Sequence, residues 1–170
     1  MLEIERINKS ALDYSLSSIK KMEILFEPLK SKLGICSFSY MKTFHDCSYL
    51  SLLSGYHEYT KKFFETIPKS DPHFIKAIQQ APYGEPCFSL WPTDSENMTP
   101  IMSLLDAYDL WHGFQITFRR QEFCEMFSFT FNKSSGNKAD FYFSNINILL
   151  KFINFFKNNA GELIDTTDKK

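Results

Sequence analysis

Two adjacent runs rich in aromatic and β-branched residues, 111–120 and 123–131, constrain the fold more than any other part of this chain. A short polar break at Gln121 and Glu122 separates them, which is the pattern of a β-hairpin. The second run alternates, so Phe127, Phe129 and Phe131 should face one side of a sheet. The smaller residues should face the other side: Cys124, Met126, Ser128 and Thr130. Neither face is fully polar, and the hairpin is therefore predicted to be central and covered on both faces.

The chain before this hairpin predicts helices and a second hairpin. Apolar residues recur at helical spacing from Leu12 to Phe26, with Ser10 as a candidate N-cap. A proline disrupts a helix interior, so Pro28 is expected to open a separate turn that Gly34 closes. The alternating segment 35–44, the polar turn 45–47 and the segment 48–53 predict a hairpin, and two short helices should follow at 56–66 and 71–80.

The remaining segments add two strands and two helices. A strand at 87–91 ends at Pro92. Thr93 and Glu96 have capping-box spacing and predict the start of a helix that continues to Tyr108, with Pro100 near its first turn. After the central hairpin we expect a polar loop, a short strand at 140–143, a helix at 145–160 and a flexible polar tail from about 161.

These elements predict a single α+β domain that spans 1–170. Its expected architecture is a three-layer α-β-α sandwich with a central, mainly antiparallel sheet of about five strands. The helices at 12–33 and 145–160 are expected on one face of that sheet, and the helices at 56–66 and 71–80 on the other. A chain of 170 residues is long enough to bury a core of this size without disulfides.

Charge and cysteine content exclude several classes of protein. The net charge is −1 with both signs scattered along the chain, so no strong positive field attracts nucleic acid or an anionic membrane. No apolar run approaches membrane-spanning length, and the first residues lack a secretion signal. The four cysteines form no CxxC pair and mostly lie in apolar runs, which is typical of free thiols in a reducing compartment. The sequence therefore predicts a cytoplasmic protein without membrane contact.

Catalytic and metal-binding patterns are weak. Cys36 or Cys47 could pair with His45 as thiol and base, but no third orienting group or oxyanion-hole loop accompanies them. The histidines and cysteines lack the spacings of zinc sites. His73 and His112 are candidate haem ligands, although a lone histidine is more often structural. No phosphate-binding glycine loop occurs, so we expect no enzyme and no bound metal or cofactor.

Four segments, taken in order, resemble the N-terminal sensory domain of LuxR-type quorum-sensing transcription regulators, in particular the divergent solo members found in Legionella. They are the hairpin 38–50, the helical stretch 57–72, the strand end Leu90-Trp91, and 111–117 with its partner strand. Each is a short pattern of common residues, and together they span nearly the whole chain. The resemblance implies a PAS-like or GAF-like sandwich that binds a small amphipathic signal molecule, an acyl-homoserine lactone in that family, between the sheet and one helical layer.

The resemblance also implies which residues contact the ligand. The family holds the polar head of the ligand with an aspartate, a tryptophan, a tyrosine and a strand hydroxyl, and encloses the tail with apolar side chains. The aspartate beside proline matches Asp71 here. Tyr59 stands where the family has its lactone-binding tryptophan, and Gly55 stands where it has the tyrosine. The implied ligand-binding set, in a pocket between the sheet and the 56–66 and 71–80 helices, is Tyr40, Tyr56, Tyr59, Phe63, Asp71, Trp91, Ser128 and Thr130.

Most of these residues also have a purely structural interpretation. An aspartate before proline is most often a helix cap, which would explain Asp71. Trp91 and Trp111 fit a core or pocket wall, since large aromatics dominate burial in a domain of this size. Ser128 lies between two phenylalanines on a central strand, where a buried hydroxyl needs a partner. It is therefore the strongest single candidate for a polar ligand contact.

Two functions of different class remain open. The first is a signal-sensing module of a LuxR-type regulator, in which a bound ligand controls dimerisation or DNA binding. The second is a stand-alone protein-interaction domain, in which phenylalanines fill the pocket and the surface pairs with other regulators. This chain has no recognisable helix-turn-helix, so DNA is expected to be contacted only through such a C-terminal domain, and a homodimer is a candidate assembly.

Overall fold

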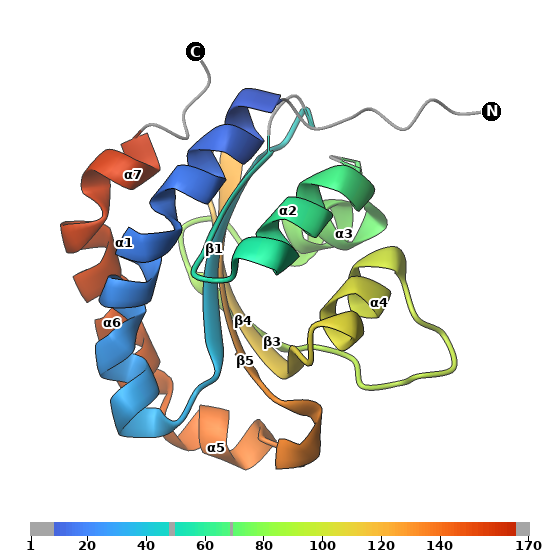
Figure 1. Cartoon of the computed structure of the whole chain (residues 1–170), viewed down its shortest axis with the longest axis vertical. Helices are drawn as coiled ribbons and strands as arrows, with labels where there is room; N and C mark the ends of the chain where they lie inside the picture. Colours follow the sequence, from blue (N-terminus) through green and yellow to red (C-terminus); the bar gives the residue numbers. More distant parts are fainter. Residues whose placement is uncertain (1–8, 48–49, 69, 166–170) are drawn as a thin grey trace.

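The computed structural model describes residues 9–47, 50–68 and 70–165, and these form three layers around one sheet (Figure 1). The sheet is antiparallel with the strand order β2-β1-β5-β4-β3. The strands are β1 (Ser37–Phe44), β2 (Leu50–Ser54), β3 (Pro86–Leu90), β4 (Trp111–Arg119) and β5 (Phe123–Phe131). The prediction of an α+β fold with a five-stranded antiparallel sheet, in which the second hairpin is central, is confirmed.

Helices cover both faces of this sheet (Figure 1). On one face lie α1 (Lys9–Leu33), α6 (Ile146–Asn159) and the short α7 (Gly161–Asp165). On the other face lie α2 (His57–Thr66), α3 (Pro72–Gln80) and α4 (Pro100–Ala107). A 3-10 turn, η1 (Lys133–Ser135), and α5 (Ala139–Ser144) connect β5 to α6. The predicted grouping of the first and last long helices on one face is therefore confirmed.

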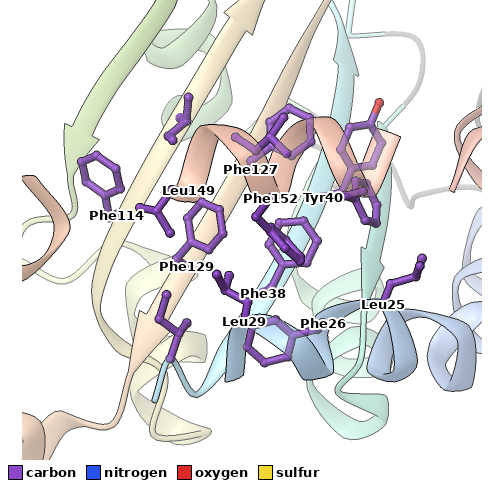
Figure 2. Packing of buried hydrophobic residues seen from close by; sticks show 14 of the residues in the cluster. Leu25, Phe26, Leu29, Phe38, Tyr40, Phe114, Phe127, Phe129, Leu149 and Phe152 are labelled. Carbon is purple, nitrogen blue, oxygen red and sulfur yellow. The ribbon is translucent and has the colours of Figure 1, made fainter. Parts of the chain in front are cut away.

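The face under α1 and α6 is an aromatic core. Phe38 lies opposite Phe129 in the β1–β5 register, and its ring centroid is 5.3 Å from that of Phe129. The rings of Phe152 and Phe156 on α6 approach Phe38 edge-on at 5.0 Å, as aromatic pairs prefer. Figure 2 shows Phe38, Phe129 and Phe152 between the strands and the helices. This half of the molecule is closed by ring-to-ring packing.

The opposite face is more mixed in chemistry. Met41 and Met126 pair across β1 and β5 and pack under the aromatic side of α2. The next row of cross-strand neighbours on the same face of the sheet has a polar residue on every strand. We call this row the polar rung, and it consists of Ser54, Ser39, Ser128, Gln115 and Ser89 in order across the sheet. A polar rung inside a sandwich is costly unless it is hydrogen-bonded or serves a ligand.

Two predictions about proline and capping were wrong. α1 runs unbroken through Pro28, although a separate turn was expected there. The ring of Pro28 is exposed, while its neighbours Leu25, Phe26 and Leu29 are buried and anchor the helix on both sides. The helix expected from Thr93 begins only at Pro100, because Thr99 is the N-cap and its Oγ1 accepts the Met102 N–H at 3.3 Å. A proline at the first helical position fits this later start.

Two predictions about the last quarter of the chain were also wrong. Residues 140–143 belong to α5 and form no strand. β5 already has β1 and β4 on its two sides, so no strand position beside it was free. Instead the Tyr142 ring stacks on Phe114 at 4.9 Å, which favours a compact helical turn. The tail predicted from about 161 is helical as far as 165, where Ile164 N–H bonds to Ala160 O at 2.9 Å, and residues 166–170 lie outside the described part.

Candidate ligand-binding site

A cavity of about 390 Å³ opens between β3–β4 and the helices α3 and α4. Its volume lies within the usual range for small-molecule sites. Its walls are mainly apolar and include both tryptophans of the chain. The lining residues that matter below are His73, Lys76, Ala77, Ser89, Trp91, Ile101, Met102, Leu105, Trp111, His112 and Gln115. This composition, apolar walls with a few polar groups, suits a guest with an apolar body and a polar head.

Gly113 determines where Trp91 lies. The Trp91 N–H donates to Gly113 O at 2.8 Å and continues the pairing of β3 with β4. A Cβ built on Gly113 would lie only 2.1 Å from the Trp91 ring, so the indole rests directly on the glycine backbone. A bulge between Trp111 and Phe114, with His112 at a φ of 48°, shapes the strand at this point. The glycine therefore lets the indole form one wall of the cavity.

The indole N–H of Trp91 is a hydrogen-bond donor without an acceptor in the described part of the chain. Trp91 Nε1 is buried and has no hydrogen-bond partner among the residues that the structure describes. A buried donor without a partner costs about 1–3 kcal/mol. A ligand acceptor in the cavity would satisfy it.

Gln115 links the cavity to the polar rung. It lies opposite Ser89 on one side and Ser128 on the other. The Ser128 hydroxyl lies 3.4 Å from Gln115 Oε1, and Gln115 Nε2 donates to Thr117 Oγ1 at 3.0 Å. Ser128 therefore reaches the cavity through the Gln115 amide and does not line it.

The start of α3 forms the side of the cavity beside Gln115. Asp71 is buried, and its carboxylate accepts the His73 backbone N–H at 2.8 Å as the N-cap of α3. Burial lowers the pKa of the His73 imidazole below its usual value, against an upward pull from the Asp71 charge and a hydrogen bond with Gln115. The imidazole is therefore neutral near pH 7 and can both donate and accept a hydrogen bond.

The structure brings only some of the predicted site residues to this cavity. Trp91 lines it, and Asp71 and Ser128 stand one residue behind the lining. Thr130, also on β5, is buried, and its hydroxyl has no partner within the described residues. Tyr59 and Phe63 belong to the packed core under α2, with ring centroids 6.1 Å apart. Burial also raises the pKa of the Tyr59 hydroxyl.

Two predicted residues point elsewhere. Tyr40 faces the α1–α6 layer, because even-numbered residues of β1 turn to that side, and its hydroxyl donates to the buried Glu125 carboxylate at 3.2 Å. Figure 2 shows the Tyr40 ring among the phenylalanines of that layer. Tyr56 is partly exposed and packs edge-on against Tyr108 at 5.6 Å. Neither residue borders the cavity at α3 and α4.

Sequence reasoning missed His73, Gln115 and His112 as lining residues, and it gave Trp111 as core or pocket wall without including it in the ligand-binding set. Gln115 had a usable signal, since it is a polar residue between Phe114 and Ile116 on a strand that should be covered on both faces. For Trp111 and His112, the β4 bulge decides which way the side chains turn, whereas His73 lies in the first turn of α3. The composition of the strand does not reveal that bulge.

A second, wider hollow of about 560 Å³ lies at the end of α1. Tyr56 and Tyr108 line it together with charged side chains that are exposed to solvent: Glu23, Glu27, Lys30 and Asp109. It is larger, but its walls are mostly polar and already solvated. The tryptophan-lined cavity is therefore the stronger candidate for an amphipathic guest.

The structure places the thiol and metal candidates as follows. β1 separates Cys36 from His45 by its whole length. His45 Nε2 lies 3.9 Å from Cys124 Sγ, whose pKa burial raises to about 11. Within residues 9–47, 50–68 and 70–165, no three His, Cys, Asp or Glu side chains are grouped to hold a metal ion. In the same part of the chain, no helix has the length and apolar character to cross a membrane.

Comparison with known proteins shows a similarity in fold to a solved structure. No protein-family model matches the chain, and no curated protein matches its sequence. Among solved structures, the fold is similar to that of CepR2 from Burkholderia cenocepacia, an N-acylhomoserine lactone dependent transcription factor of the LuxR family. The match has a TM-score of 0.55 and covers 93% of this chain and 96% of that chain at 13% sequence identity. The two proteins share a fold while differing at most positions.

Proposed function

We propose that this chain is the signal-sensing, ligand-binding domain of a LuxR-type transcription regulator. A small amphipathic molecule binds between the sheet and the helices α3 and α4. Its occupancy controls dimerisation or the activity of a DNA-binding domain. The observation that carries the proposal is the cavity of about 390 Å³ walled by Trp91 and Trp111, with Ser89 and Gln115 of the polar rung in its lining.

The fold supports this proposal. CepR2, which has the same fold, is named for its dependence on an N-acylhomoserine lactone. The family resemblance in the sequence implies a ligand between the sheet and one helical layer, and the cavity lies in that kind of position. The asymmetry of the sandwich adds weight, because one face is closed by phenylalanines while the other keeps space and polar groups.

The proposed contacts follow from the cavity walls. The apolar body of the ligand packs on Ala77, Ile101 and the two indoles, and its head accepts a hydrogen bond from Trp91 Nε1. Tyr59 and Phe63 fill the space under α2, so the ligand lies nearer α3 and α4 than α2. Asp71 and Ser128 position the lining residues His73 and Gln115.

A thermal-shift screen tests the proposal. Acyl-homoserine lactones, fatty acids and α-hydroxyketones are screened against the wild type and Ala77→Phe, which places a ring into the cavity. A ligand that binds only the native state raises the melting temperature in proportion to the logarithm of its concentration. We expect a hit on the wild type that Ala77→Phe loses.

The matched control is Ala107→Phe, the same change at an exposed position of α4 outside the cavity. It should keep the shift. If no compound stabilises the wild type, or if Ala77→Phe responds as strongly as Ala107→Phe, the sensing proposal fails.

A second candidate function is protein interaction, and one observation favours it. Phe88 and Leu90 on the edge strand β3, together with Phe143 on α5, are large apolar side chains with substantial exposure. They gather around Phe114, whose ring centroid is 6.1 Å from that of Phe88 and 5.9 Å from that of Phe143. An exposed apolar patch of this kind is typical of an interaction surface. Substitution of Phe143 by Lys, outside the lining of the tryptophan-lined cavity, should abolish partner binding if this function is the correct one.

A further inference from the structure

Lys76 is the one charged side chain among the described residues that line the tryptophan-lined cavity. Lys76 lies at its mouth on α3, and His73 and His112 contribute imidazoles. Among the described residues that line the cavity, none is an aspartate or a glutamate. Asp71 lies behind the lining, where its carboxylate is occupied by the His73 backbone N–H. The lining therefore carries one positive charge, in a chain whose net charge is −1.

Two helices also begin at the cavity. Its walls include Pro72 and His73 from the first turn of α3, and Thr99 and Ile101 from the start of α4. The N-terminal end of a helix carries a partial positive charge. The α4 dipole, whose N-cap is the neutral Thr99, adds to the effect of Lys76, whereas the Asp71 carboxylate already caps α3.

The hydrogen-bonding groups of the cavity also favour a negatively charged ligand group. Trp91 Nε1 can only donate, and it is buried without a partner in the described part of the chain. Ser89 and Gln115 add groups that can donate from the floor of the cavity. A carboxylate accepts several hydrogen bonds at once and donates none, so it fits this set better than an amine does.

The wider hollow at the end of α1 shows the opposite balance. Its charged walls are Glu23, Glu27 and Asp109 against a single lysine, Lys30. The charged side chains that line these two hollows therefore have net charges of opposite sign.

From these observations we infer that the ligand of this cavity is an amphiphile with a carboxylate head, such as a medium-chain or aromatic carboxylic acid. The inference rests on the proposed function and narrows its ligand class. The carboxylate lies near Trp91 Nε1 and the start of α4, and the apolar body packs on the two indoles. Lys76 at the mouth adds charge attraction that solvent partly screens.

Intrinsic fluorescence provides a label-free test, because both tryptophans of the chain line the cavity. The protein is titrated at pH 7.5 with decanoic acid, decanamide and decylamine, each below its critical micelle concentration. These probes share an apolar chain and differ in the head group. We expect decanoic acid to bind about ten-fold more tightly than decanamide, and decylamine to bind most weakly.

The matched variants are Lys76→Gln at the mouth and Lys61→Gln at an exposed position of α2. Lys76→Gln should weaken decanoic acid about three-fold and leave decanamide unchanged, whereas Lys61→Gln should change neither. Decanamide or decylamine binding as tightly as the acid would overturn the inference while the sensing proposal stands. Equal effects of the two lysine variants on decanoic acid would also overturn it. If none of the three probes changes the fluorescence, the sensing proposal and the inference both fail for this cavity.

Discussion

Gly113 and Trp91 compete for the same small space at the wall of the cavity. A Cβ at position 113 would come within 2.1 Å of the indole, so Gly113→Ala must displace the ring or the strand. Overpacking of this kind costs about 1–3 kcal/mol of unfolding free energy. We expect Gly113→Ala to lose that much stability in urea denaturation and to lose ligand binding as well.

Gly161→Ala is the matched control, because a Cβ there meets no atom within 4 Å. It should be close to neutral. If Gly113→Ala is as stable as Gly161→Ala and still binds ligand, the Trp91 wall is not fixed as described.

His73 makes stability depend on pH. Burial is the main cause that lowers the pKa of His73 in the folded protein. Below pH 6.5, the ordinary pKa of histidine, this imidazole therefore binds a proton more readily in the unfolded chain than in the folded protein. The contribution of the neutral His73 imidazole to the unfolding free energy is complete above pH 6.5. It is lost as the pH falls from 6.5 through the pKa of His73 in the folded protein. We expect the unfolding free energy to decrease between pH 7 and pH 5, and His73→Gln to flatten that decrease.

Other charges near His73 are Asp71, which opposes the shift, and Lys76, which adds to it. His57→Gln, at an exposed position of α2, serves as the control and should keep the wild-type pH profile. A steep decrease that persists unchanged in His73→Gln would show that another group is responsible.

At the scale of elements, the β5–α6 contact is expected to dominate stability. Phe129 is fully buried and packs against Phe38 and Phe152. Replacing it with alanine removes these contacts and leaves a cavity, at a cost of about 3–5 kcal/mol. Phe155→Ala, the same change at a partly exposed position of α6, should stay within about 0.5 kcal/mol of the wild type in guanidinium denaturation. Equal losses in the two variants would contradict the aromatic-core account.

The elements that were predictable from sequence are those with a clean period. The alternation of Phe38 and Tyr40 on β1, and of Phe127 and Phe129 on β5, correctly separated the two faces of the sheet. The failures came from short or interrupted patterns. Residues 140–143 have strand-like composition, yet the sheet offered no place beside β5, and only tertiary structure contains that information.

The candidate site was less predictable than the fold. Trp91 was identified, and Asp71 was correctly recognised as a possible N-cap. Tyr40 was assigned to the pocket although its strand parity places it with Phe38, on the other face of the sheet. Gln115 and Trp111 depend on register and on the β4 bulge, which follow from pairing between strands. Their contacts could not be read from a single segment.

At the scale of the whole molecule, the two halves of the sandwich differ in how they are packed. The α1–α6 half is filled by aromatic rings and supplies the rigid support. The α2–α4 half carries the polar rung and the cavity, with an unpartnered indole N–H among its described groups. A guest in the cavity would complete the packing and hydrogen bonding of this half, which explains why binding should stabilise the entire domain.

Native mass spectrometry tests this central claim most directly, because it reports stoichiometry and, with the cavity variants, location. The wild type, Ala77→Phe and Ala107→Phe are each incubated with the same library of lactones, carboxylic acids and hydroxyketones. The account predicts a one-to-one adduct with the wild type and Ala107→Phe that is missing from Ala77→Phe. The absence of any adduct with the wild type, or an adduct that persists equally in Ala77→Phe, would contradict it.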